Sequence, residues 1–146
     1  MAQIRKATAT WNGDLPTGSG TVTAATTGIF KSLPINWNAR TENPGALTSP
    51  EELLATAHAA CFSMAFCNVM AKAGITGQSV ETTVTMTADK TDAGWRVLKS
   101  DIEVTGRGTG LDAAKFQELA DQAKDGCPIS VAIKGNVQLS VKATLA

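Results

Sequence analysis

One long apolar segment, residues 49–74, constrains the fold of this chain more than any other part of the sequence. It reads SPEELLATAHAACFSMAFCNVMAKAG. Ser49 and Glu52 are expected to form a capping box around Pro50 at the first helical position, and Gly74 to supply a left-handed stop. The segment is therefore predicted to be a single helix. Because it is apolar or small on every side, we expect the rest of the chain to bury it.

The same segment is about long enough to span a membrane. Polar residues interrupt it, alanine dominates it, and neither a second span nor a basic flank accompanies it. We therefore favour a buried helix of a soluble domain and expect no membrane partner.

The thirteen basic and thirteen acidic residues cancel, so charge predicts no nucleic-acid partner. The first residues, MAQIRKATATW, lack an apolar signal core, which favours a cytoplasmic location.

Alternating and turn-forming segments flank the expected helix on both sides. Before it, we predict strands within 3–11 and 19–27 around a turn at 12–14, a short strand at 28–33, and an ordered loop at 34–48. After it, we predict strands at 79–90, 95–105 and 136–142, a helix at 111–124 and a helical turn at 128–133. This order predicts one α+β domain, residues 1–146, in which antiparallel sheets wrap the central helix.

Three cysteines, Cys61, Cys67 and Cys127, form neither a CxxC pair nor a zinc-like quartet. An odd number of cysteines argues against a framework of structural disulfides. Cys127 precedes Pro128 at the expected start of a short helix, where the pKa of a thiol is lowered. Cys61 and Cys127 thus offer one thiol to be oxidised and another to resolve it. The alternative for Cys61, and the favoured interpretation of Cys67, is a buried cysteine that packs as a small hydrophobe.

Other polar residues are ambiguous when each is considered alone. His58 and Cys61 are three residues apart on the expected helix, so with Cys127 they could ligate a metal. A lone histidine among alanines is more often a hydrogen-bonded core residue. Glu51 is explained by capping, because a carboxylate is favourable at the positive end of the helix dipole. Arg40, considered alone, is explained as a solvent-exposed side chain.

Three segments together resemble the osmotically inducible protein C (OsmC) family, which is related to the organic hydroperoxide resistance (Ohr) proteins. They are NWNART (36–41), SPEELLATAHAACFSMAF (49–66) and KDGCPIS (124–130). The resemblance covers nearly the whole chain, including TATWNGDLPTGSGTV and TADKTDAGW. The OsmC branch fits better than the Ohr branch, because an arginine stands in the N-A-R-T-E loop and a histidine precedes Ala-Ala-Cys.

The resemblance implies a thiol-dependent peroxidase that reduces organic hydroperoxides and, less well, hydrogen peroxide. Cys61 matches the peroxidatic cysteine and Cys127 the resolving cysteine, while Arg40 and Glu51 match the residues that support the reactive thiolate. It further implies an intertwined homodimer with active sites at the subunit interface, reduction by a lipoyl-type or other dithiol, and no metal or organic cofactor. Cys67 is an extra thiol that the motif does not require.

Helix geometry adds a constraint that the motif does not contain. Glu51 and Cys61 are ten residues apart, roughly 15 Å along one helix axis, so they cannot meet within an unbroken helix. A two-fold axis near residue 56 would place Glu51 of one chain beside Cys61 of another, and the small side chains of Ala57 and Ala60 would permit close approach. We favour this arrangement over a broken helix.

Two rival functions remain open from the sequence. One is a non-enzymatic stress protein that binds a small apolar ligand beside the long helix. The other is a metal-binding protein that uses His58, Cys61 and Cys127.

Overall fold

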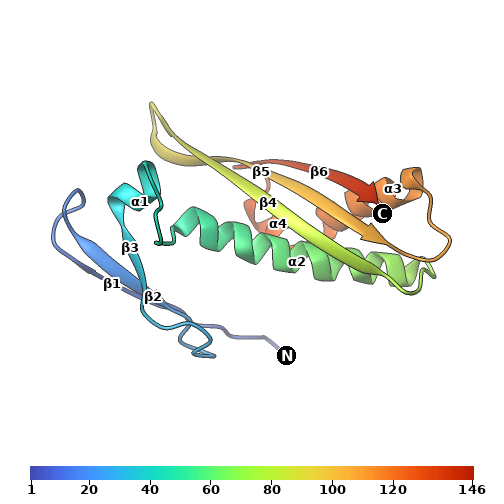
Figure 1. Cartoon of the computed structure of the whole chain (residues 1–146), viewed down its shortest axis with the longest axis horizontal. Helices are drawn as coiled ribbons and strands as arrows, with labels where there is room; N and C mark the ends of the chain where they lie inside the picture. Colours follow the sequence, from blue (N-terminus) through green and yellow to red (C-terminus); the bar gives the residue numbers. More distant parts are fainter. The chain divides into compact units, whose positions relative to one another are not determined.

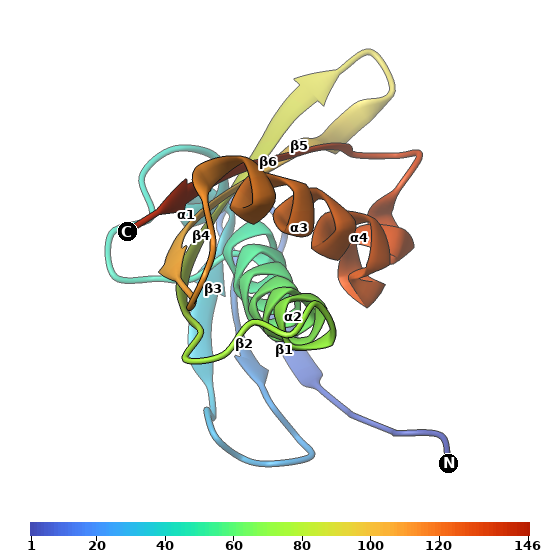
Figure 2. The same ribbon diagram turned by 90° about the vertical axis from the view of Figure 1, so that its right-hand side faces the viewer.

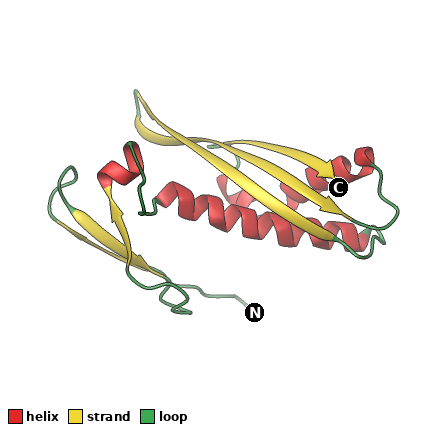
Figure 3. Ribbon diagram, viewed as in Figure 1, coloured by secondary structure: helices red, strands yellow, loops and turns green.

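The computed structural model describes all residues, 1–146, and the chain falls into two compact units, Met1–Leu53 and Leu54–Ala146. The first unit contains β1 (Thr8–Asn12), β2 (Ser19–Thr23), β3 (Leu33–Asn36) and α1 (Trp37–Thr41). Helix α2 (Pro50–Lys72) starts in the first unit and continues in the second, which adds β4 (Ser79–Thr91), β5 (Gly94–Arg107), α3 (Ala113–Gly126), α4 (Pro128–Ile133) and β6 (Gln138–Leu145). Helices and strands are mixed along the chain, which confirms the α+β class (Figures 1 and 3).

The first unit is a three-stranded antiparallel sheet followed by a short helix. Strands β1 and β2 pair from Thr8 opposite Thr23, and β3 adds to the other edge of β2. The turn between β1 and β2 contains Gly13 at φ +88°, a left-handed conformation that glycine adopts without steric cost. The predicted hairpin is confirmed. The predicted strand at 28–33 is wrong, since β3 covers Leu33–Asn36, and the expected loop 34–48 contains most of β3 and all of α1.

Helix α2 has the ends that the sequence predicts. The backbone N–H of Glu52 donates to Ser49 Oγ at 3.1 Å, and the Glu52 carboxylate accepts a 2.6 Å hydrogen bond from the Thr48 hydroxyl. At the other end Gly74 has φ +78°, and the N–H of Ile75 donates to the carbonyl of Met70 at 3.0 Å. The bonds of the Glu52 and Ile75 N–H groups satisfy backbone groups that a helix end leaves without partners. The helix is continuous over 23 residues between the two caps.

The second unit has a mixed sheet in the order β4-β5-β6. Strands β4 and β5 form the predicted antiparallel hairpin, with Ser79 opposite Arg107. Strand β6 pairs with β5 in parallel, starting with Lys99 opposite Gln138, so the expectation of purely antiparallel sheets is wrong here. Helices α3 and α4 lie between β5 and β6 in the chain, and such a long crossover connection is what a parallel pair requires.

The core of the second unit forms between α2, α3 and the sheet. The phenylalanine rings at its centre are tilted against each other, with centroids 5.6 Å apart for Phe62 and Phe66 and 5.0 Å apart for Phe66 and Phe116. Figure 2 looks nearly along α2 and shows β4, α3 and α4 around the upper side of the helix. The buried hydrophobic residues of this cluster are Phe62, Phe66, Met70, Ile102, Val104, Phe116, Leu119, Ala120, Ala123 and Cys127.

The opposite face of α2 is uncovered within the single chain, which corrects the expectation that the chain wraps the helix completely. The side chain of Met64 is 68% exposed, and the exposed residues of α2 include Ala57, Ala60 and Asn68. By length and composition α2 could cross a membrane, and 22% of its apolar stretch is buried. Its other face nevertheless packs into the core, as the core helix of a soluble protein does.

We predict that Phe66→Ala destabilises the protein by about 3–5 kcal/mol, because the change leaves a cavity between two aromatic rings. Urea unfolding at fixed protein concentration measures this difference. Ile29→Ala is the control, since the Ile29 side chain is 82% exposed and should change stability by less than about 0.5 kcal/mol. Equal effects of the two changes would contradict this description of the core.

Candidate active site

Arg40 and Glu51 form an ion pair within the first unit. Arg40 Nη2 donates to Glu51 Oε1 at 2.7 Å, and Arg40 Nε donates to Oε1 and Oε2 at 3.0 and 3.2 Å. The arginine side chain is 30% exposed and the glutamate side chain 11% exposed. A guanidinium held by several bonds to one carboxylate keeps a fixed orientation, which a lysine could not reproduce. The two residues that were predicted to act together are therefore in direct contact.

Local structure around Arg40 fixes its position. Asn36 caps α1, because its side-chain oxygen accepts a 2.7 Å hydrogen bond from the N–H of Ala39. The Arg40 guanidinium lies 5.6 Å from the centroid of the Trp37 ring, within the range of a cation–π interaction. Sequence reasoning missed both roles. The signal was an asparagine three residues before Ala39, since asparagine is a preferred N-cap.

An open cavity of about 200 Å³ lies beside Arg40 in the first unit. The residues that line it are Trp11, Leu15, Ile35, Asn36, Trp37, Arg40 and Pro50. Most of these side chains are apolar, and Arg40 is the charged group among them. The cavity can therefore hold an apolar molecule and place one polar end of it near a guanidinium.

Cys61 and Cys127 meet within the second unit. The Cys127 thiol donates to Cys61 Sγ, and the two sulfur atoms are 3.1 Å apart with both cysteines reduced. Cys127 is buried and stands at the N-cap of α4, where its N–H donates to the carbonyl of Ala123 at 2.8 Å. A disulfide has an S–S distance of about 2.05 Å, so a movement of about 1 Å would join the two sulfur atoms.

The surroundings of Cys61 oppose ionisation of its thiol. Burial raises the pKa of the Cys61 thiol above its ordinary value, and the adjacent sulfur of Cys127, which would repel a second negative charge, raises it further. The backbone N–H of Ile129 has the opposite effect on this pKa, because a hydrogen-bond donor stabilises a thiolate. A nearby cation would favour the thiolate at this position, because positive charge lowers the pKa of a thiol.

His58 has two serine partners. Its Nδ1 lies 2.8 Å from Ser100 Oγ, and its Nε2 lies 2.8 Å from Ser130 Oγ. All three side chains are buried, and burial lowers the pKa of His58, which favours the neutral ring. Because both ring nitrogens already have partners, His58 has no free nitrogen to offer a metal. This geometry matches the alternative of a hydrogen-bonded core histidine.

The four predicted site residues thus form two pairs, Arg40 with Glu51 in the first unit and Cys61 with Cys127 in the second. Cys67 lies among the partly buried residues that pack against the core, consistent with its interpretation as a small hydrophobe.

Residues 43–142 match the protein family described as "OsmC-like protein". The chain is 39% identical to "Peroxiredoxin OsmC" of Escherichia coli (strain K12), over 95% of this chain and 96% of that protein. It is 34% identical to "Organic hydroperoxide resistance protein OhrB" of Bacillus subtilis (strain 168), over 65% of this chain and 68% of that protein. The crystal structure of OhrB of Bacillus subtilis is similar with a TM-score of 0.66 and 27% identity, and the comparison covers 95% of this chain and 98% of that chain.

We predict that Cys127→Ala lowers the pKa of the Cys61 thiol, because Cys127 contributes to raising it. The measurement is the rate of Cys61 alkylation by iodoacetamide as a function of pH, followed by peptide mass analysis. In Cys127→Ala this rate should begin to rise at a lower pH than in the parent chain. Both proteins should also carry Cys67→Ser, so that they differ only in the presence of the Cys127 thiol. A profile that is unchanged or shifted to higher pH would refute this reading of the thiol pair.

Proposed function

The chain belongs to the OsmC-like protein family and is a thiol-dependent peroxidase of organic hydroperoxides, and we propose that it works through a two-cysteine cycle on Cys61 and Cys127. The observation that carries the proposal is the 3.1 Å separation of the two reduced sulfur atoms. Structural cysteines of a core need no such partner, whereas a peroxidatic and a resolving thiol must meet.

In the first step the Cys61 thiolate attacks one oxygen of the hydroperoxide. The S–O bond forms, the O–O bond breaks, and the leaving alkoxide takes a proton to become an alcohol. Cys61 is then a sulfenic acid, oxidised by two electrons. In the second step the sulfur of Cys127 attacks Cys61 Sγ, water leaves, and a Cys61–Cys127 disulfide remains.

A dithiol reductant closes the cycle by thiol–disulfide exchange. One of its sulfurs opens the Cys61–Cys127 bond to a mixed disulfide, and the second sulfur releases the protein thiols while the reductant becomes a cyclic disulfide. We propose a lipoyl-type dithiol for this role. The cycle as proposed needs no metal or organic cofactor.

We propose that Arg40 stabilises the Cys61 thiolate and polarises the peroxide, with Glu51 holding the guanidinium in place. A nearby cation lowers the pKa of a thiol, which offsets the effect of burial on Cys61. Helix α2 is continuous from Pro50 to Lys72, so Glu51 and Cys61 are separated by about 15 Å of helical rise. The Arg40–Glu51 pair of one chain therefore stabilises the Cys61 thiolate of a second chain in a homodimer.

The uncovered face of α2 supports this dimer. Ala57 and Ala60 lie on that face and are exposed, and their small side chains allow another helix to approach closely. Met64 adds an exposed apolar side chain on the same face. An antiparallel crossing about a two-fold axis near residue 56 covers this face and repeats the same contact in both chains.

The cavity beside Arg40 supports an organic substrate. Trp11, Leu15 and Ile35 contribute apolar lining, and hydrogen peroxide would gain nothing from such a lining. We propose that the organic part of the hydroperoxide lies in this cavity with its O–O group toward Arg40. The rival function, non-enzymatic binding of an apolar ligand, uses the same cavity but leaves the cysteines unchanged.

One equivalent of cumene hydroperoxide should remove two of the three thiols of the reduced protein, and peptide mapping should locate a Cys61–Cys127 disulfide. Cys61→Ser should reduce peroxide turnover to the uncatalysed rate, because the attacking sulfur is gone. Cys67→Ser is the matched control and should keep full activity.

A Cys61→Ser chain that still turns over would rule out the proposed cycle. Thiols that are insensitive to peroxide, together with unchanged binding of an apolar ligand in Cys61→Ser, would instead support the non-enzymatic alternative.

A further inference from the structure

His58 links three elements of the second unit through its ring. It lies on α2, Ser100 lies on β5, and Ser130 lies on α4. The two 2.8 Å hydrogen bonds occupy both ring nitrogens. A neutral imidazole has one N–H donor and one acceptor nitrogen, and a serine hydroxyl can complement either one. The link is therefore complete without any charged group.

The His58–Ser130 bond lies one helical turn away from the cysteine pair on both helices. His58 precedes Cys61 by three residues on α2, and Ser130 follows Cys127 by three residues at the start of α4. Residues three apart share one face of a helix. The same two segments are therefore joined twice, once by the His58–Ser130 bond and once by the contact between the sulfur atoms.

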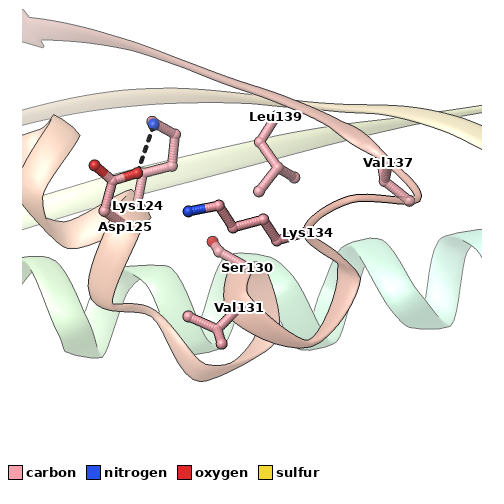
Figure 4. Close-up of a pocket in the computed structure, with 7 residues that line it drawn as sticks. All are labelled: Lys124, Asp125, Ser130, Val131, Lys134, Val137 and Leu139. Carbon is pink, nitrogen blue, oxygen red and sulfur yellow. Dashed lines mark hydrogen bonds and ion pairs between the residues drawn. The ribbon is translucent and has the colours of Figure 1, made fainter.

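Helix α4 is short and depends on contacts with the rest of the second unit to keep its place. It contains six residues, and the side chain of its N-cap residue makes no capping hydrogen bond. A helix this short is not stable by itself. An open cavity of about 230 Å³ lies beside α4. Figure 4 shows residues that line it, Ser130, Val131 and Lys134 among them. Ile129 packs against the core from α4, and the bond between Ser130 and His58 adds a directional restraint on this helix.

We propose that His58 is a positioning residue for the resolving step, which with Ser130 holds α4 so that Cys127 stays within reach of the oxidised Cys61. The proposal rests on the two-cysteine cycle proposed above. In that step the S–S bond forms, the S–O bond of the sulfenic acid breaks, and water leaves with the Cys127 proton. His58 exchanges no proton in this step; it acts by keeping the sulfur of Cys127 in line with Cys61.

The test separates the two half-reactions in Ser130→Ala, Ser130→Thr and His58→Gln. Trapping with dimedone measures formation of the Cys61 sulfenic acid, and thiol titration with peptide mapping measures its condensation with Cys127. We expect Ser130→Ala and His58→Gln to slow condensation by about tenfold, the effect of one lost hydrogen bond. Oxidation of Cys61 by cumene hydroperoxide should stay within about twofold of wild type, and Ser130→Thr, which keeps the hydroxyl, should restore condensation.

Ser63→Ala is the matched control on α2. The Ser63 hydroxyl bonds to the carbonyl of Ala59 and to Thr82 Oγ1, both at 2.8 Å, and takes no part in the His58 link. This control should condense at the wild-type rate. Wild-type condensation in Ser130→Ala, or an equal slowing of both half-reactions, would overturn the proposal.

A second measurement is independent of peroxide chemistry. Equilibration with a glutathione redox buffer gives the effective concentration of Cys127 relative to Cys61, which should fall about tenfold in Ser130→Ala. An unchanged value would overturn the positioning role even if the peroxidase cycle is correct. Failure of the cycle itself appears separately, as the absence of a trappable Cys61 sulfenic acid in Cys127→Ala, where no resolving thiol can consume it.

Discussion

The continuity of helix α2 sets the distance on which the site depends. Glu51 stands in the first turn and Cys61 near the middle, and no break in the helix shortens the rise of about 15 Å between them. The carboxylate therefore orients Arg40 within its own unit, while the thiol pairs with Cys127 in the other. One helix thus carries a residue of each pair, and the uncovered face between them leaves room for a second copy.

The surroundings of Cys61 disfavour its ionised form. Partial burial raises the pKa of the Cys61 thiol, and the neighbouring Cys127 raises that pKa further. The dithiol of an isolated chain is thus well placed for disulfide formation but poorly ionised for attack on a peroxide. A cation beside the thiol would lower this pKa and favour the thiolate.

Local signals in the sequence predicted much of the fold and of the site. The capping residues Ser49 and Gly74 and the alternation of 79–90 act through neighbouring residues, so helix α2 and strand β4 were predictable. The parallel pairing of β6 with β5 was not predictable, because it depends on how α3 and α4, which connect the two strands, pack in the fold. The serine partners of His58 also escaped prediction, since residues 100 and 130 meet it only through tertiary packing. The site residues themselves came from the family resemblance, and the structure adds their contacts.

The most direct test of the central claim is complementation between two inactive chains. Glu51→Ala and Cys61→Ser proteins, unfolded together and refolded as a mixture, should form mixed dimers in about half of the molecules. Each mixed dimer contains one intact Arg40–Glu51 pair facing one intact Cys61, so the mixture should recover about a quarter of wild-type peroxidase activity. Each protein refolded alone should stay inactive. No recovery on mixing would contradict a site completed by a second chain.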